Sequence, residues 1–200
     1  IARGLEKADL VLKDARIVNV FTEEIIRGDI AIQDGIIAGI GSFHGKEERD
    51  LAGRYVCPGF IDSHLHLEST LVTPAELVTV ASRHGTTTFI VDPHESANVS
   101  GLAGIDYILD QTEDVKANVY VMMPSCVPAT AIDDNGCTLT AEDMVPYLHN
   151  SRILGLGEVM DSISVVQGEK SMHDKLELFE GRIRDGHAPF LEEGDLQAYA

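Results

Sequence analysis

The chain has 200 residues, and its 33 Asp and Glu against 15 Lys and Arg give a formal charge of −18. This excess of acid argues against nucleic-acid or anionic-membrane binding, because such binding depends mainly on Lys and Arg. A composition of 44% hydrophobic and 24% charged residues excludes a disordered chain. No apolar run reaches the roughly 18 residues that span a bilayer, the first residues lack a signal-peptide core, and no C-x-x-C pair is present. We expect a cytoplasmic protein of one or two domains.

Residues 1–56 are predicted to form a small β-rich segment. Residues 9–20 and 29–40 are rich in Val and Ile, and such runs separated by turns are typical of antiparallel strands. The predicted turns are Lys13-Asp14 and Asp34-Gly35. A charged connector is expected at residues 46–50.

Residues 57–200 alternate between apolar strand-like runs and helical segments. Strands are expected at 60–67, 88–93, 118–124, 153–159 and near 182–187, and helices at 74–84, 101–113, 141–150 and 171–179. Pro74 and Thr140 are typical of helix starts. Five polar residues fall at or just past the predicted strand ends, about thirty residues apart: His66, His94, Ser125, Glu158 and His187. This period is that of β-α-β units, so we predict an α/β protein with a parallel sheet.

Two architectures remain open at this point. A closed (β/α)8 barrel takes roughly 250 residues, so the length after the β-rich segment favours an open doubly wound sheet. The motifs described next favour a barrel. If the barrel is right, this chain holds its first five β/α units and is the front part of a longer protein.

The densest polar group follows the first predicted barrel strand. His64 and His66 are two residues apart and therefore project from the same strand face. Two imidazoles placed in this way can bind one metal ion. The alternative is a pair of histidines with an ordinary structural role.

Glu158 ends the Gly-rich apolar run 153–158, and Gly155 and Gly157 beside it indicate that another group comes close. A carboxylate here could bridge two cations, or it could cap the next helix. His187 adds another imidazole one repeat later. We take Glu158 as the candidate catalytic residue.

A second polar cluster, Asp92-Pro93-His94-Glu95, follows the second predicted strand. Asp92, His94 and Glu95 are expected to bind substrate, hold an extra metal or orient the metal ligands; the alternative is a polar turn with a helix cap. Ser125 is expected to line the same mouth.

These segments resemble the amidohydrolase superfamily and, within it, the adenine deaminases. The resemblance rests on five segments: GFIDSHLHLEST at 59–70, DPHESANV at 92–99, MPSCVPAT at 123–130, GLGEVM at 155–160 and DGHAP at 185–189. It implies a metal-dependent hydrolase barrel, incomplete in this chain, preceded by the small β-rich domain. It also implies hydrolytic deamination of adenine to hypoxanthine and ammonia.

The resemblance further implies the metal site. His64 and His66 would hold one divalent transition metal ion, Glu158 would bridge two, and His187 would help to hold the second; manganese or iron is expected, with zinc an alternative. The family also uses a histidine from the sixth strand and an aspartate from the eighth, which have no counterpart in these residues. Two other functions therefore stay open: an amidohydrolase of a cyclic amide or amidine, and a non-catalytic metal-binding fragment. The expected partner is adenine, with no nucleic acid and no membrane, in a homo-oligomer.

Overall fold

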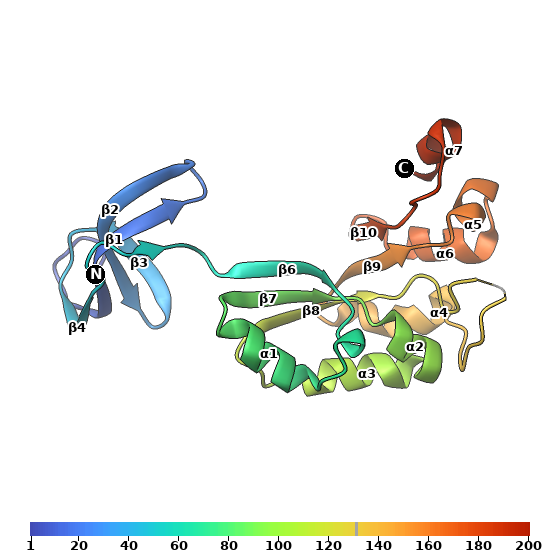
Figure 1. Ribbon diagram of the computed structural model, residues 1–200, viewed down its shortest axis with the longest axis horizontal. Helices are drawn as coiled ribbons and strands as arrows, with labels where there is room; N and C mark the ends of the chain where they lie inside the picture. The colour runs from blue at the N-terminus through green and yellow to red at the C-terminus, as the bar shows by residue number, and fades with distance from the viewer. Residues whose placement is uncertain (131) are drawn as a thin grey trace. The chain divides into compact units, whose positions relative to one another are not determined.

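The computed structural model describes residues 1–130 and 132–200 and divides into two compact units, Ile1–Pro58 and Gly59–Ala200 (Figure 1). Each unit is described by itself below. Among the described residues, no helix combines the length and the apolar character that a membrane crossing requires.

The first unit is a five-stranded β-sheet. Its strands are β1 (Ala8–Asn19), β2 (Glu24–Gln33), β3 (Ile36–Gly41), β4 (Gly45–Asp50) and β5 (Tyr55–Val56). β1 pairs antiparallel with β2 and parallel with β4 and β5, while β3 pairs antiparallel with β2. The predicted Asp34-Gly35 turn joins β2 to β3, and both residues have the positive φ that a tight hairpin turn requires.

Two predictions for this unit were wrong. Lys13 and Asp14 form no turn, because β1 continues through them with a shift of register between Leu12 and Ala15, a β-bulge. The Asp14 N–H donates to the Asp29 carboxylate instead, at 3.2 Å. The predicted charged connector at 46–50 is strand β4, whose exposed charged side chains suit a sheet edge.

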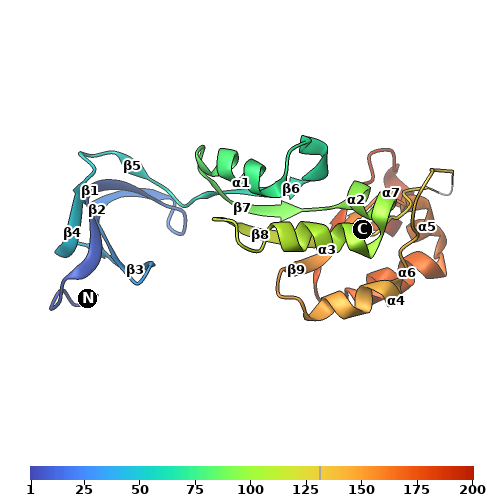
Figure 2. The same cartoon turned by 90° about the horizontal axis from the view of Figure 1, so that it is seen from below.

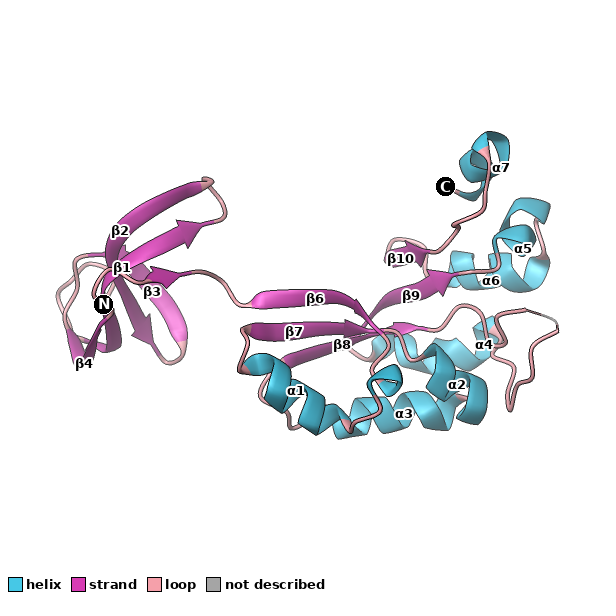
Figure 3. Ribbon diagram, in the orientation of Figure 1, coloured by secondary structure: helices cyan, strands magenta, loops and turns pink. Residues whose placement is uncertain are grey.

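The second unit alternates strands and helices (Figure 3). Its strands are β6 (Phe60–Leu65), β7 (Thr86–Val91), β8 (Asn118–Met123), β9 (Ile153–Val159) and β10 (Ile183–Gly186). Its α-helices are α1 (Pro74–Ser82), α2 (His94–Ser100), α3 (Leu102–Gln111), α4 (Ala141–Met144), α5 (Ser162–Gln167), α6 (Lys170–Leu178) and α7 (Glu193–Tyr199). Two 3-10 helices lie at Glu68–Thr70 and Val145–His149.

The order of the strands distinguishes the two predicted architectures. All four strand pairs are parallel, and the order across the sheet is β10-β9-β8-β7-β6, so each strand lies beside its neighbour in sequence. In a doubly wound sheet the strand order reverses at a switch point. In a β/α barrel each new strand is added beside the one before it, always in the same direction, and this is the order found here. The sheet also curls (Figure 2). The fold is an incomplete β/α barrel with a β-rich part, as predicted.

The sequence signals for helix starts were correct, whereas the predicted extents of the helices were less accurate. Pro74 opens α1, and the Thr140 side chain caps α4 by accepting from the Asp143 N–H. The helix predicted at 141–150 is instead α4 followed by a 3-10 helix, because Pro146 has no N–H for the α-helical bond. The short helices α2, α5 and α7 were not predicted.

The barrel core lies between the sheet and its helices. Buried strand residues such as Val91, Val121 and Leu156 pack in one cluster with Ile105 of α3 and with Phe179, which directly follows α6. Because the strands are parallel, their carboxyl ends all lie at the same end of the sheet, where the arrowheads of β7 and β9 lie in Figure 3. Side chains that follow these strands are thereby brought together.

Candidate metal centre

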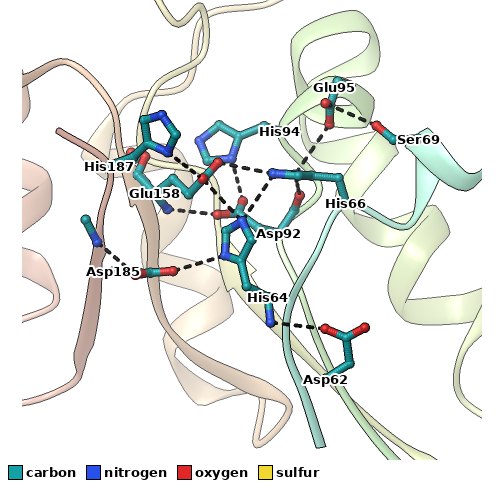
Figure 4. Close-up of polar contacts among 12 residues, drawn as sticks. Asp62, His64, His66, Ser69, Asp92, His94, Glu95, Glu158, Asp185 and His187 are labelled. Carbon is teal, nitrogen blue, oxygen red and sulfur yellow. Dashed lines mark hydrogen bonds and ion pairs between the residues drawn. The ribbon is translucent and has the colours of Figure 1, made fainter. Parts of the chain in front are cut away.

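Two imidazoles extend from the end of β6, as their spacing predicted (Figure 4). His64 lies in the strand and His66 directly follows it, while Leu65 between them packs against the core. The Nε2 atoms of the two histidines lie 3.3 Å apart. The pair thus presents two nitrogen donors to the same point.

Each imidazole is oriented through its other nitrogen. His64 Nδ1 lies 3.1 Å from Oδ2 of Asp185, and His66 Nδ1 lies 2.7 Å from the backbone carbonyl oxygen of Asp92. An acceptor at Nδ1 keeps the proton there and leaves the Nε2 lone pair free for a metal. The nitrogens that face each other are therefore the ones available as ligands.

The Glu158 carboxylate completes this group from β9. Its Oε1 lies 3.2 Å from His64 Nε2, its Oε2 lies 3.2 Å from His66 Nε2, and the residue is only 8% exposed. Glu158 is not the cap of the following helix, because the Asp161 side chain accepts from the Ser164 N–H at the start of α5. The carboxylate is free for the site.

The spacing of these donor atoms fits a metal ion. Ligands about 2.0–2.1 Å from a tetrahedral ion such as zinc lie about 3.3–3.4 Å from one another. The two Nε2 atoms are 3.3 Å apart, and each lies 3.2 Å from one of the two Glu158 oxygens. Two neutral imidazoles and one carboxylate are ligands that divalent transition metals accept. The residues present therefore fit a divalent metal.

The local charges also favour a cation. Burial alone would lower the pKa of His66, but its hydrogen bond to the Asp92 carbonyl and the negative charges of Glu95 and Glu158 outweigh burial and raise that pKa. Positive charge between these groups is therefore stabilised.

His187 reaches the site from the segment that follows β10. Its Nδ1 lies 3.1 Å from Oε1 of Glu158, and its side chain is 51% exposed. Glu158 thus contacts His64, His66 and His187 at once. The structure brings together all four residues for which a metal role was predicted.

Asp92 and His94 lie behind Glu158. Asp92 is 1% exposed, and its Oδ2 accepts from the Glu158 N–H at 2.8 Å. Its Oδ1 is 2.5 Å from His94 Nδ1 without hydrogen-bond geometry, and within the described residues neither nitrogen of this buried imidazole has a hydrogen-bond partner. Asp92, His94 and Glu158 form a second group whose donor atoms lie within 4.8 Å of one another. These residues could bind a second ion or a polar substrate atom.

The two remaining predicted residues have different positions. Glu95 Oε2 lies 3.6 Å from His66 Nδ1, at the rim of the site. Ser125 is fully buried, and its hydroxyl donates to the Glu158 carbonyl oxygen. Ser125 therefore supports the backbone of Glu158 from behind.

Two contributing residues were not predicted. Asp185 orients His64, and its only signal in the sequence was an acid two residues before His187. Lys175 of α6 is buried and donates from Nζ to the Ser125 carbonyl oxygen at 2.7 Å, and burial lowers the pKa of this lysine. A lysine in a polar helix gives no signal that it is buried.

Comparison with known proteins adds three findings. Residues 55–192 match the amidohydrolase family. The adenine deaminase of Desulfitobacterium hafniense (strain Y51) is 60% identical over 197 residues, which make up 98% of this chain and 35% of that protein. Adenine deaminase 2 of Carboxydothermus hydrogenoformans is 48% identical over 199 residues, 100% of this chain and 35% of that protein.

The chain thus spans about a third of the length of the curated relatives that it matches. Among solved structures, the atrazine chlorohydrolase TrzN of Arthrobacter aurescens TC1, complexed with zinc, is 16% identical with a TM-score of 0.52. That match covers 69% of this chain and 41% of the other, and it shows a likeness of fold alone.

Proposed function

The chain belongs to the amidohydrolase family, and on that premise we propose that it is part of an adenine deaminase, which hydrolyses adenine to hypoxanthine and ammonia. The observation that carries this proposal is the set of three donor atoms on His64, His66 and Glu158, in a chain 60% identical to a protein of that name. Geometry supports the metal chemistry, and the relatives support the substrate.

The family and the donor set support a divalent metal. We propose two ions, manganese or iron: His64 and His66 would hold the first, His187 would help to hold the second, and Glu158 would bridge them. When bound, such an ion supplies Lewis acidity, which makes water a usable nucleophile near neutral pH.

Glu158 is the proposed proton carrier. Hydrolytic deamination needs a proton on a ring nitrogen of the purine and then on the departing amine. Glu158 has both carboxylate oxygens directed at the site, and its backbone is held by Asp92 and Ser125. A carboxylate fixed in this way can accept a proton and return it at a defined place.

We propose that adenine binds in the neighbouring cavity. The cavity has a volume of ≈ 520 Å³ and is lined in part by His94, Glu95, Cys126 and Met160. Ligand pockets typically measure roughly 300–1,000 Å³. His94 Nε2, which has no hydrogen-bond partner within the described residues, would hydrogen-bond the purine edge, and Met160 would contact its face.

The predicted setting of the enzyme is part of the same proposal. The free cysteines Cys57, Cys126 and Cys137 support a reducing compartment such as the cytoplasm, and the charge of −18 argues against nucleic-acid binding. A homo-oligomer stays a prediction.

The test uses the full-length protein, stripped of metal with a chelator and reloaded with manganese, iron or zinc. We expect adenine deamination to return with two ions per chain, and His64→Ala to abolish it. His84→Ala, at an exposed histidine just after α1, is the matched control and should keep wild-type turnover. Turnover of a cyclic amide in place of adenine would overturn the proposed substrate. Full activity of the metal-free protein would overturn the proposed requirement for a metal.

A further inference from the structure

We propose that Tyr199 is a positioning residue that holds His187 against Glu158 and thereby sets the affinity for the second metal ion; this inference rests on the two-ion part of the proposed function. Tyr199 is the last residue of α7. Its hydroxyl donates to the Val159 carbonyl oxygen at 2.6 Å and accepts from the His187 N–H at 3.0 Å. One hydroxyl thus joins the backbone next to Glu158 to the backbone of His187.

The regular sheet pairing ends just before His187. β10 has four residues and pairs in parallel with β9. The pairing shifts register between Arg184 and Gly186, just before His187. His187 itself lies beyond this strand, and its N–H is held by the Tyr199 hydroxyl.

Gly186 makes room for that anchor. A Cβ atom built on Gly186 would lie 2.9 Å from the Tyr199 hydroxyl oxygen and 3.2 Å from its Cε1. Contacts this close require the tyrosine to move. The glycine and the tyrosine therefore act together, because the absent side chain of one admits the hydroxyl of the other.

The consequence falls on the two candidate ligands. His187 Nδ1 and Glu158 Oε1 are 3.1 Å apart, and the hydroxyl of Tyr199 fixes the backbone on both sides of this contact. Loss of a group that orients a metal ligand typically lowers metal affinity about 10–100-fold. The Tyr199 hydroxyl bonds to Val159 and His187 and not to His64 or His66, so we expect the ion that this pair holds to be affected much less.

Tyr199→Phe in the full-length protein tests the proposal, because it removes only the hydroxyl. Tyr147→Phe is the matched control: its hydroxyl donates to Asp106 Oδ1 at 2.7 Å, between a 3-10 helix and α3. Competition with a chelator gives the affinity for each manganese ion, circular dichroism gives the melting temperature, and steady-state kinetics separates kcat from KM.

We expect Tyr199→Phe to bind the first ion like the wild type, to bind the second about 10–100-fold more weakly, and to lower kcat with little change in KM at limiting metal. Gly186→Ala should reproduce the weaker second site by displacing the tyrosine. Wild-type affinity for both ions in Tyr199→Phe, an equal loss in Tyr147→Phe, or a wild type that binds one ion would overturn the proposal. A wild type that binds two ions without deaminating adenine would overturn the proposed substrate and leave the role of Tyr199 standing.

Discussion

At the scale of single residues, Glu158 is the side chain on which the site depends. It contacts three imidazoles through its two oxygens, while Asp92 and Ser125 hold its N–H and its carbonyl oxygen. Its conformation is therefore fixed before any ion binds. Glu158 therefore provides two properties to the site, a negative charge and a fixed position.

Glu158→Gln in the full-length protein separates these two properties. The amide keeps the size of the side chain and removes its charge, so we expect the occupancy of at least one metal to fall. Loss of acid-base catalysis alone would lower kcat about 10²–10⁴-fold, and simultaneous loss of metal should lower it further. Elemental analysis and adenine turnover measure the two effects; near wild-type turnover with two ions bound would remove Glu158 from the site.

Asp29 gives a pH-dependent prediction for the β-rich unit. Burial would raise the pKa of Asp29, but its hydrogen bonds from Lys13, Phe43 and Asp14 outweigh burial and lower that pKa. A lowered carboxyl pKa stabilises the fold above the unfolded-state pKa of about 3.9, and this stability is lost as the pH falls through the folded-state pKa.

Asp29→Asn should therefore lower the melting temperature at pH 7, and its difference from the wild type should shrink below about pH 4. Thermal denaturation at a series of pH values measures this. Asp110→Asn, an exposed carboxylate on α3, should show no such difference. A constant gap between Asp29→Asn and the wild type at all pH values would contradict the assigned charge effect.

The candidate metal ligands were easier to predict from the sequence than the residues that orient them. His64, His66, Glu158 and His187 were identifiable because each lies at or just after the end of a strand and is a metal-binding residue type. Lys175 and Tyr199 act through hydrogen bonds to backbone atoms distant in sequence. Such contacts depend on packing, and no local pattern reports them.

At the scale of elements, β9 shows how a strand makes room for a site. The sequence predicted that Gly155 and Gly157 admit a neighbouring group, and the structure confirms this. A Cβ on Gly157 would lie 2.2 Å from Asp92 Oδ2, and one on Gly155 would overlap the Ile183 carbonyl oxygen of β10. The first glycine admits a carboxylate to the Glu158 N–H, and the second admits the adjacent strand.

Gly157→Ala should consequently displace Asp92 and break its hydrogen bond to Glu158. Overpacking of this kind costs about 1–3 kcal/mol of folding free energy, and we also expect weaker metal binding. Gly194→Ala in α7 is the control, because its Cβ meets no atom within 4 Å and alanine favours a helix over glycine. Denaturant unfolding and metal titration check both variants; equal stability of the two would refute the steric role of Gly157.

The predictions of elements failed where tertiary contacts override local signals. Lys13-Asp14 resembles a turn, yet the Asp29 carboxylate satisfies the Asp14 N–H and lets β1 continue. Residues 46–50 are too charged to suggest a strand, but β1 supplies a parallel partner for β4. The inner strands β8 and β9 were easier to predict, because both are mostly buried and therefore largely apolar.

At the scale of the whole molecule, the sheet of the second unit has two edges. β6 and β10 each pair on one side only within the described residues, and Phe60, Ile61 and Ile183 are exposed on them. Unpaired edges with apolar side chains favour association between chains. The curated relatives are almost three times as long as the matched region, and a barrel closes only when further strands cover both edges.

We therefore expect residues 1–200, expressed alone, to form dimers or aggregates and to lack adenine deaminase activity, whereas the full-length protein is monodisperse and active. Size-exclusion chromatography with light scattering and an adenine assay measure both properties. Ile61→Lys places a charge on the β6 edge and should reduce association of the short chain without restoring turnover, because the histidine and the aspartate expected from later strands would still be missing. Val80→Lys, an exposed apolar residue on α1, is the control and should leave association unchanged. A monomeric short chain that deaminates adenine would show that five strands suffice for the site, and the unpaired edges would then have no functional cost.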